Sequence, residues 1–224
     1  MFITFEGPEG GGKSTQARLL AERLRAAGRA IWLTREPGGT PLAGAFRALL
    51  LRTEASLAAL AEANLTPGDA PAEEMLPLTE ALLLSAARAQ HVPCIREHLA
   101  AGEIVICDRF ADATRAYQGS ARGFDMAAIT TLEDMATGGL RPDLTLLLDL
   151  PAEAGQARKA QASVTGGDWD RIDAESLAFH QRVRAGYLEL AAAEPERILI
   201  VDANQPSERL SDIIWETVVA RLPA

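Results

Sequence analysis

The sequence predicts an α/β fold in which a five-stranded parallel sheet carries helices on both faces, as three layers. Five short apolar runs alternate with longer helical stretches along the chain. The runs are continuous and do not alternate apolar with polar residues, which is typical of parallel strands buried on both faces. A glycine-rich segment follows the first run directly, where a strand of such a fold turns into a helix.

The expected strands are the apolar runs themselves. They are Phe2–Phe5, Ala30–Leu33, Ile104–Cys107, Leu144–Leu148 and Ile198–Val201. Ligands of open α/β sheets bind beyond the carboxyl ends of the strands. The polar residues that follow these runs are therefore the first candidates for a site.

The expected helices fill the intervals between the runs. Ser14–Ala27 is amphipathic and stops before Gly28, a good C-cap. Glu80–Ala101 is Ala- and Leu-rich, with a break or kink expected at Pro93 and an end at Gly102. Further helices are expected over Met126–Thr137, Leu177–Ala193 and Ser207–Leu222.

Two segments interrupt this pattern. Thr53–Glu74 is Ala-rich and punctuated by Pro and Gly, which indicates a surface insertion. Residues 155–172 are expected to form a small lid, with Gly166 and Gly167 at its tip. Neither segment marks a domain boundary, so residues 1–224 are expected to form a single domain.

Composition narrows the class of protein. With 48% hydrophobic and 24% charged residues the chain can bury a core, which excludes general disorder. A formal net charge of -9 argues against binding nucleic acid or an anionic membrane. Two cysteines without CxxC spacing exclude a disulfide scaffold, and the first residues do not resemble a signal peptide. A cytoplasmic setting is therefore expected.

The most specific motif lies between the first expected strand and the first expected helix. Residues 7–14, GPEGGGKS, match GxxxxGK[ST], the phosphate loop (P-loop) of nucleoside triphosphate-binding proteins. Glycines allow the backbone N–H groups to point at phosphate oxygens, and the helix N-terminus adds positive potential. The sequence thus predicts a nucleoside triphosphate site comprising Gly7, Pro8, Glu9, Gly10, Gly11, Gly12, Lys13, Ser14 and Thr15.

A metal position accompanies this loop. The Ser14 hydroxyl is placed to ligate Mg²⁺. The run Ile104–Cys107 ends in Asp108, and a carboxylate there faces the metal in P-loop proteins. Mg²⁺ with ATP is the expected cofactor, held by Ser14 and Asp108.

The phosphate loop alone leaves three classes open: a switch GTPase, a partner-driven ATPase and a small-molecule kinase. The NKxD that reads guanine is absent, and Pro8 and Glu9 stand where partner-driven ATPases carry a second lysine. A kinase needs a second anion site built from arginines. Candidates are Arg35, Arg47, Arg88 and Arg109.

Several segments together resemble the thymidylate kinase family along nearly the whole chain. They are FEGPEGGGKSTQ from Phe5, TREPGGTPL from Thr34, AARAQH from Ala86, DRFADATRAYQG from Asp108, RPDLTLLLDLP from Arg141, DRI from Asp170 and RAGYLELA from Arg184. The resemblance implies a P-loop NTPase fold, transfer of the ATP γ-phosphoryl group to dTMP on the route to dTTP, and a homodimer.

The resemblance also implies a set of acceptor contacts. Glu9 corresponds to an acidic residue near the 3′-hydroxyl, and Arg88 to the arginine that addresses thymine. Tyr117 corresponds to a tyrosine that crowds the ribose 2′ position and favours deoxynucleotides. The implied dTMP-binding residues are Glu9, Arg47, Leu84, Arg88, Arg109, Thr114, Tyr117 and Gln118, with Arg47 and Arg109 near the acceptor phosphate.

Two departures from the family pattern are visible. Leu84 stands where the family has a phenylalanine that stacks on thymine, which keeps a kinase with another nucleoside or nucleotide acceptor open. The lid holds few cations, of which Arg158 is the first choice for the transition state, before Arg171 and Lys159. The expected catalytic residues are Lys13, Arg109 and Arg158, and a partner-driven ATPase stays as the alternative from another class.

Overall fold

The computed structural model describes residues 1–51, 75–164 and 169–222. These residues contain one five-stranded parallel sheet in the order β2-β3-β1-β4-β5. The strands are β1 (Phe2–Glu6), β2 (Ile31–Arg35), β3 (Ile104–Asp108), β4 (Leu144–Asp149) and β5 (Ile198–Asp202). The predicted parallel sheet is confirmed, and every strand extends past its apolar run into the polar residue that follows.

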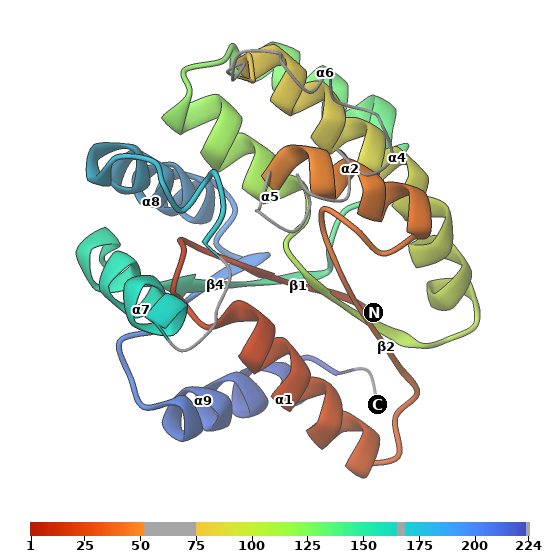
Figure 1. Ribbon diagram of the computed structural model, residues 1–224. Coiled ribbons are helices and arrows are strands. Elements are labelled where there is room, and N and C mark those ends of the chain that lie inside the picture. The colour runs from red at the N-terminus through yellow and green to blue at the C-terminus, as the bar shows by residue number, and fades with distance from the viewer. Residues whose placement is uncertain (52–74, 165–168, 223–224) are drawn as a thin grey trace.

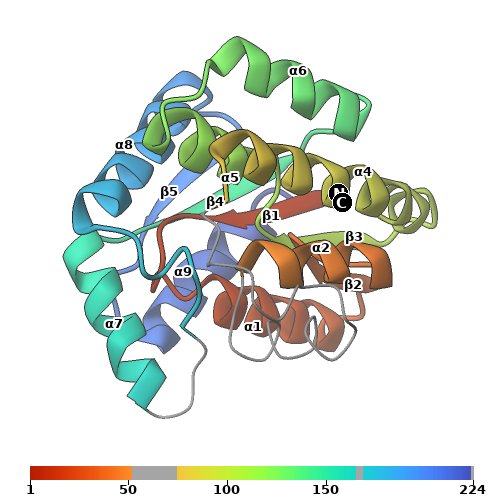
Figure 2. The same cartoon turned by 45° about the horizontal axis from the view of Figure 1, so that its top comes forward.

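Helices cover both faces of the sheet, as Figures 1 and 2 show. On one face lie α1 (Lys13–Ala26) and α9 (Ser207–Val219). The other face carries α4 (Pro77–Ala100), α5 (Ala111–Thr114), the π-helical turn η1 (Arg115–Ala121), α6 (Met126–Thr137) and α8 (Leu177–Ala193). Two more helices, α2 (Pro41–Leu51) and α7 (Ala152–Val164), flank the carboxyl ends of the strands and pack on α4 and α8.

The alternation of side chains along each strand distributes them between two cores. In β1, Ile3 and Phe5 pack with the apolar stripes of α1 and α9. Phe2 packs on the opposite side, with Val92 and Ile95 of α4. Since Thr4 and Glu6 share that side with Phe2, a buried carboxylate at the end of β1 faces the layer that contains α8.

Helix α4 corrects one expectation. It runs through Pro93 without interruption, so the expected break there is wrong. A proline costs a helix one backbone hydrogen bond, but Val92 and Ile95 on either side of it are buried in the sheet-facing core. Tertiary packing therefore holds the helix together until Ala100, and Gly102 follows with a φ of 80°.

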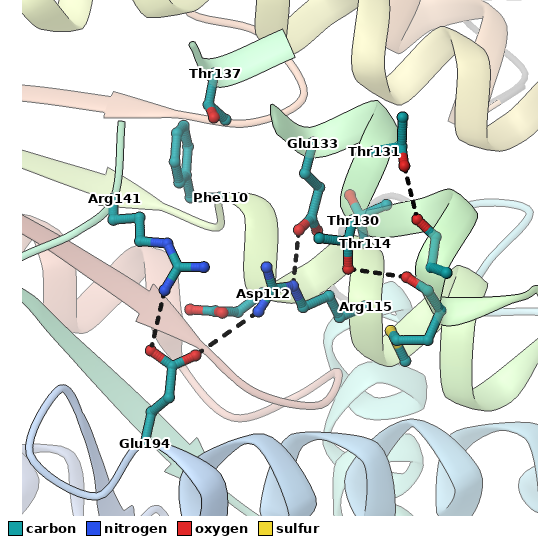
Figure 3. A network of polar contacts seen from close by, with 12 residues as sticks. Phe110, Asp112, Thr114, Arg115, Thr130, Thr131, Glu133, Thr137, Arg141 and Glu194 are labelled. Carbon is teal, nitrogen blue, oxygen red and sulfur yellow. Dashed lines mark hydrogen bonds and ion pairs between the residues drawn. The ribbon is translucent and has the colours of Figure 1, made fainter. Parts of the chain in front are cut away.

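A polar network joins the helices on the α8 side, as Figure 3 shows. Arg115 of η1 donates from Nε to the Glu133 carboxylate of α6 at 2.7 Å and lies 3.7 Å from Glu194. Arg141 reaches the other oxygen of Glu194, also at 3.7 Å. These contacts connect η1, α6 and the end of α8 into one layer behind the site.

Two expectations lie outside the described residues. The insertion expected over Thr53–Glu74 is among them, and so is the glycine tip of the lid at 166 and 167. Within the described ranges, no helix is both long enough and apolar enough to cross a membrane.

Candidate active site

The phosphate loop runs from the end of β1 to the start of α1. Gly7, Gly10 and Gly12 have φ values of 132°, 73° and 84°, which side chains disfavour. A Cβ on Gly7 would also lie 2.4 Å from the Leu148 carbonyl oxygen. Gly12 caps α1 without a side-chain hydrogen bond, so the N–H groups of the first turn point toward a ligand position.

Lys13 begins α1 and is buried beneath the loop. Its Nζ donates to the Pro8 carbonyl oxygen at 2.8 Å. Burial, together with the nearby positive charge of Arg109, lowers the pKa of Lys13 to about 8. A phosphate beside Lys13 would offset that repulsion, as a nucleotide-binding lysine requires.

A cavity of about 620 Å³ opens beside the loop. It lies at the carboxyl ends of the strands and is bounded by α1, α2, α4, η1 and α7. The predicted site residues that line it are Glu9, Gly10, Gly12, Lys13, Ser14, Thr15, Arg47, Leu84, Arg88, Asp108, Arg109, Thr114, Tyr117, Gln118 and Arg158. Gly7, Pro8 and Gly11 form the loop without lining this cavity.

Arg109 is the most constrained side chain of the site. It follows β3 with a φ of 70°, a left-handed conformation that is costly for a residue with a side chain. Its Nη2 donates to Glu9 Oε1 at 2.6 Å and to the Tyr117 hydroxyl at 3.0 Å. Its Nη1 donates to the Gly7 carbonyl at 3.2 Å and to the Tyr187 hydroxyl at 3.1 Å.

Glu9 is held as an anion by this arrangement. Burial alone would raise the pKa of Glu9, but Arg109 and Lys13 outweigh burial, and the Tyr117 hydroxyl donates to the same carboxylate at 2.8 Å. The pKa of Glu9 falls to about 2. The carboxylate is thus an ionised hydrogen-bond acceptor at the cavity wall.

Arg88 extends from α4 to the cavity and is buried with its polar atoms satisfied. Nε donates to Glu36 Oε2 at 2.8 Å, Nη1 to Thr114 Oγ1 at 3.0 Å and Nη2 to the Phe110 carbonyl at 3.0 Å. Glu36 also contacts His91 Nδ1 at 3.0 Å. Three residues, one just after β2 and two from α5 and its N-cap, therefore fix the orientation of one guanidinium.

A second cluster closes the far end of the cavity around Glu80. Its carboxylate accepts from Gln118 Nε2 at 2.6 Å and from Arg122, and it also contacts Arg171. Arg171 donates from Nε to the Leu50 carbonyl at 3.1 Å. The sequence placed Arg171 among the lid cations for ATP, whereas here it bridges the lid segment to α2 and α4.

Ser14 and Asp108 face each other across the loop. The Ser14 hydroxyl donates to Asp108 Oδ2 in a short contact. A hydroxyl and a carboxylate are hard oxygen donors, the type that Mg²⁺ accepts. The residues expected to hold the metal are therefore adjacent.

The lid cations lie at two different places. Arg158 of α7 donates from Nη1 to the carbonyls of Gly10 at 3.4 Å and Ala203 at 3.1 Å, so it reaches the phosphate loop. Lys159 pairs with Asp173 at 2.9 Å. Arg158 therefore places a lid cation against the phosphate loop, whereas Lys159 takes Asp173 as a partner.

Arg47 and Arg35 supply positive charge on the other wall. Arg47 donates to the Pro37 carbonyl at 3.1 Å, and burial and the nearby Arg35 lower its pKa. The buried Arg47 charge beside Arg35 therefore forms a position that an anion would stabilise.

Sequence reasoning assigned no role to several residues of the site. Glu36 and Tyr187 lie inside segments that resemble the family, which was the available signal. Glu6 also lies inside such a segment, directly after the first apolar run. Glu80, near the start of a helix, offered no signal, because acids at a helix start have an ordinary electrostatic explanation.

Comparison with known proteins identifies the family of this chain. A family model described as thymidylate kinase matches residues 5–70 and 57–214. A thymidylate kinase of Thermomicrobium roseum is 50% identical over 218 residues, covering 97% of this chain and 93% of that protein. One of Trichlorobacter lovleyi is 48% identical over 225 residues, covering 99% and 98%. The crystal structure of thymidylate kinase from Ehrlichia chaffeensis aligns with a TM-score of 0.69 and 31% identity, covering 100% of this chain and 98% of that one. The chain belongs to the thymidylate kinase family.

Proposed function

We propose that this protein transfers the γ-phosphoryl group of ATP to dTMP, giving dTDP and ADP on the route to dTTP. The observation that carries the proposal is a single cavity that joins a phosphate loop to a second set of cations, Arg35, Arg47 and Arg109. A kinase needs two phosphates held in line, whereas a switch protein has no use for the second position.

On the ATP side, residues 7–15 surround the triphosphate with backbone N–H groups and Lys13 supplies a positive charge. Arg158, which reaches Gly10, is placed to neutralise charge that develops on the transferred group. Because the acceptor is a phosphate oxygen that is already ionised, no general base is required.

The oxygen donors of Ser14 and Asp108 fit Mg²⁺, which the family implies. When bound with ATP, Mg²⁺ would neutralise phosphate charge. Their juxtaposition supports this assignment, since both donors already point to one place.

On the acceptor side, the contacts suit a deoxynucleotide. Gln118 is buried and lines the cavity, and its Oε1 has no hydrogen-bond partner among the described residues, so it can accept the N3–H of thymine. Arg88 and Thr114 lie nearby for the base carbonyl oxygens. Glu9 and Tyr117 line the sugar position and Arg47 and Arg109 the phosphate position, while Leu84 packs on the base in place of an aromatic ring.

We further propose a single kinase domain over residues 1–224 that acts as a cytoplasmic homodimer without nucleic-acid or membrane partners. The net charge of -9 supports the absence of polyanionic partners. Exposed leucines on α2 and α4, at Leu42, Leu78 and Leu82, support a contact between copies.

The decisive experiment measures ADP formation from ATP and Mg²⁺ with each nucleoside and nucleoside monophosphate in turn. The proposal expects turnover that depends on the acceptor and is fastest with dTMP, and expects a Lys13→Ala variant to lose it. ADP formation at the same rate with and without each acceptor would reject a kinase and favour a partner-driven ATPase. A faster acceptor other than dTMP would reject only the substrate, with Leu84 as the residue to examine first.

A further inference from the structure

Each end of the Arg109 guanidinium bonds to a tyrosine hydroxyl that in turn donates to a glutamate side chain. At the Nη2 end stands the Tyr117 hydroxyl, which donates its hydrogen to Glu9 at 2.8 Å. At the Nη1 end stands the Tyr187 hydroxyl, which donates its hydrogen to Glu6 at 2.7 Å. Each hydroxyl accepts from the arginine because a carboxyl oxygen behind it takes the hydroxyl hydrogen.

The two halves of this arrangement differ in position. Tyr117 and Glu9 line the cavity, where a substrate would touch them. Tyr187, in α8, is 2% exposed, Glu6, at the end of β1, is 0% exposed, and neither lines the cavity. The second pair acts on a ligand only through Arg109.

Glu6 also holds the backbone beside the arginine. Its second oxygen accepts the Phe110 N–H at 2.7 Å, directly after Arg109 and its left-handed φ of 70°. One carboxylate thus fixes the costly backbone turn and, through Tyr187, the side chain that leaves it. Strain of this kind persists only where the surroundings enforce it, and it concentrates at functional sites.

We propose that Tyr187 is a positioning residue for Arg109, with Glu6 as its buried support. The Tyr187 hydroxyl fixes the Nη1 end, so that the guanidinium presents its charge to the acceptor phosphate in one orientation. This inference rests on the proposed function, because the phosphate position belongs to it.

The test replaces Tyr187 by phenylalanine, which removes one hydroxyl and keeps the ring in its core. Turnover with dTMP and inhibition by thymidine, which lacks the phosphate, are measured on the same preparation. We expect kcat/KM for dTMP to fall roughly tenfold, since Nη1 then rests on its longer, 3.2 Å bond to the Gly7 carbonyl and the guanidinium is aligned less firmly. The inhibition constant of thymidine should change by less than about twofold, because the base and sugar contacts are intact.

Two comparisons separate positioning from general damage. Thr4→Val removes a different buried hydroxyl, in β1, which pairs with the Thr145 hydroxyl at 2.8 Å and lies outside the cavity. This variant should leave both kcat/KM for dTMP and the inhibition constant of thymidine near the values of the natural protein. Tyr117→Phe removes the other hydroxyl that holds Arg109 but alters the sugar wall as well, so it should affect both dTMP and thymidine.

If Tyr187→Phe does not yield folded protein, Glu6→Gln provides a second measurement, because its single amide oxygen cannot accept from both the Phe110 N–H and the Tyr187 hydroxyl. The proposal expects a loss that is again selective for dTMP but smaller, about threefold to fivefold. Unchanged kcat/KM, or equal losses for dTMP and thymidine, in a folded variant would overturn it. Absence of dTMP-dependent turnover in the natural protein would instead reject the proposed function, which keeps the two failures distinct.

Discussion

Arg158 is an exposed arginine of α7 that reaches back over the phosphate loop. If it stabilises the transition state, Arg158→Ala should lower kcat by roughly 100-fold while the KM for dTMP changes by less than about threefold. Steady-state kinetics with dTMP varied at saturating ATP measures both values. Arg18→Ala, a change on the exposed face of α1, is the control. An unchanged kcat would move the role to Arg171 or Lys159.

Leu84 lines the cavity where the family carries an aromatic ring. Leu84→Phe should restore stacking on the base, worth about 1 kcal/mol, and lower the KM for dTMP by roughly fivefold. The exposed Met135 of α6 provides the control Met135→Phe, which should leave the KM unchanged. A higher KM in Leu84→Phe would show that the cavity wall there has no room for a ring.

The ionised Glu9 links the stability of the fold to pH. Since its pKa is lowered from 4.5 to about 2, its charge stabilises the folded protein above pH 4.5, and this contribution is lost as pH falls toward 2. Glu9→Gln should therefore lower the free energy of unfolding by about 2 kcal/mol at pH 7, with a smaller difference at pH 3.

Urea unfolding at several pH values measures this difference. Glu22→Gln, which removes an exposed carboxylate paired with Arg18, should cost no more than about 0.5 kcal/mol at any of them. If the difference in unfolding free energy between the natural protein and Glu9→Gln stays constant as the pH falls, an ionised Glu9 is contradicted.

At the scale of elements, the start of α7 packs directly against the phosphate loop. A Cβ on Gly155 of α7 would lie 2.3 Å from the Glu9 carbonyl oxygen, and one on Gly10 would lie 2.4 Å from the Gly155 carbonyl oxygen. Backbone packs on backbone here, so the start of α7 and the loop must move together.

Gly155→Ala should therefore displace the loop and raise the KM for ATP by roughly tenfold, although alanine favours a helix. Gly44→Ala provides a matched helical control in α2, because no described residue comes within 4 Å of its Cβ position. It should leave kinetics unchanged and raise the free energy of unfolding by about 0.5–1 kcal/mol. An unchanged KM for ATP in Gly155→Ala would show that α7 can shift without displacing the loop.

At the scale of the whole molecule, Arg197, directly before β5, joins α5 to the end of α8. Its Nη atoms donate to the two oxygens of the buried Asp112 at 2.7 and 2.9 Å, and its Nε donates to Glu194 at 2.8 Å. Arg197→Ala leaves Asp112 charged and unpaired beneath the sheet, which should cost about 3–5 kcal/mol. Chemical unfolding measures the loss, and Arg18→Ala, where both partners are exposed, should cost less than about 1 kcal/mol. A small loss would mean that water reaches Asp112.

Much of this fold followed from local pattern. Continuous apolar runs predicted each strand, and helices Met126–Thr137 and Leu177–Ala193 were predicted to their exact ends, where Asp125 and Ser176 cap them. The break expected at Pro93 was wrong, because a local rule does not include the packing of neighbouring residues.

The sequence by itself determined the phosphate loop, the sheet and the set of candidate cations, because these depend on short spacings and on residue chemistry. Only the tertiary structure decided which partner each cation takes: Arg109 between two tyrosines, Arg171 on Glu80 and Arg158 on the loop. Those partners lie far apart along the chain, and no local pattern encodes a contact that forms only when strands and helices from different segments meet at one edge of the sheet.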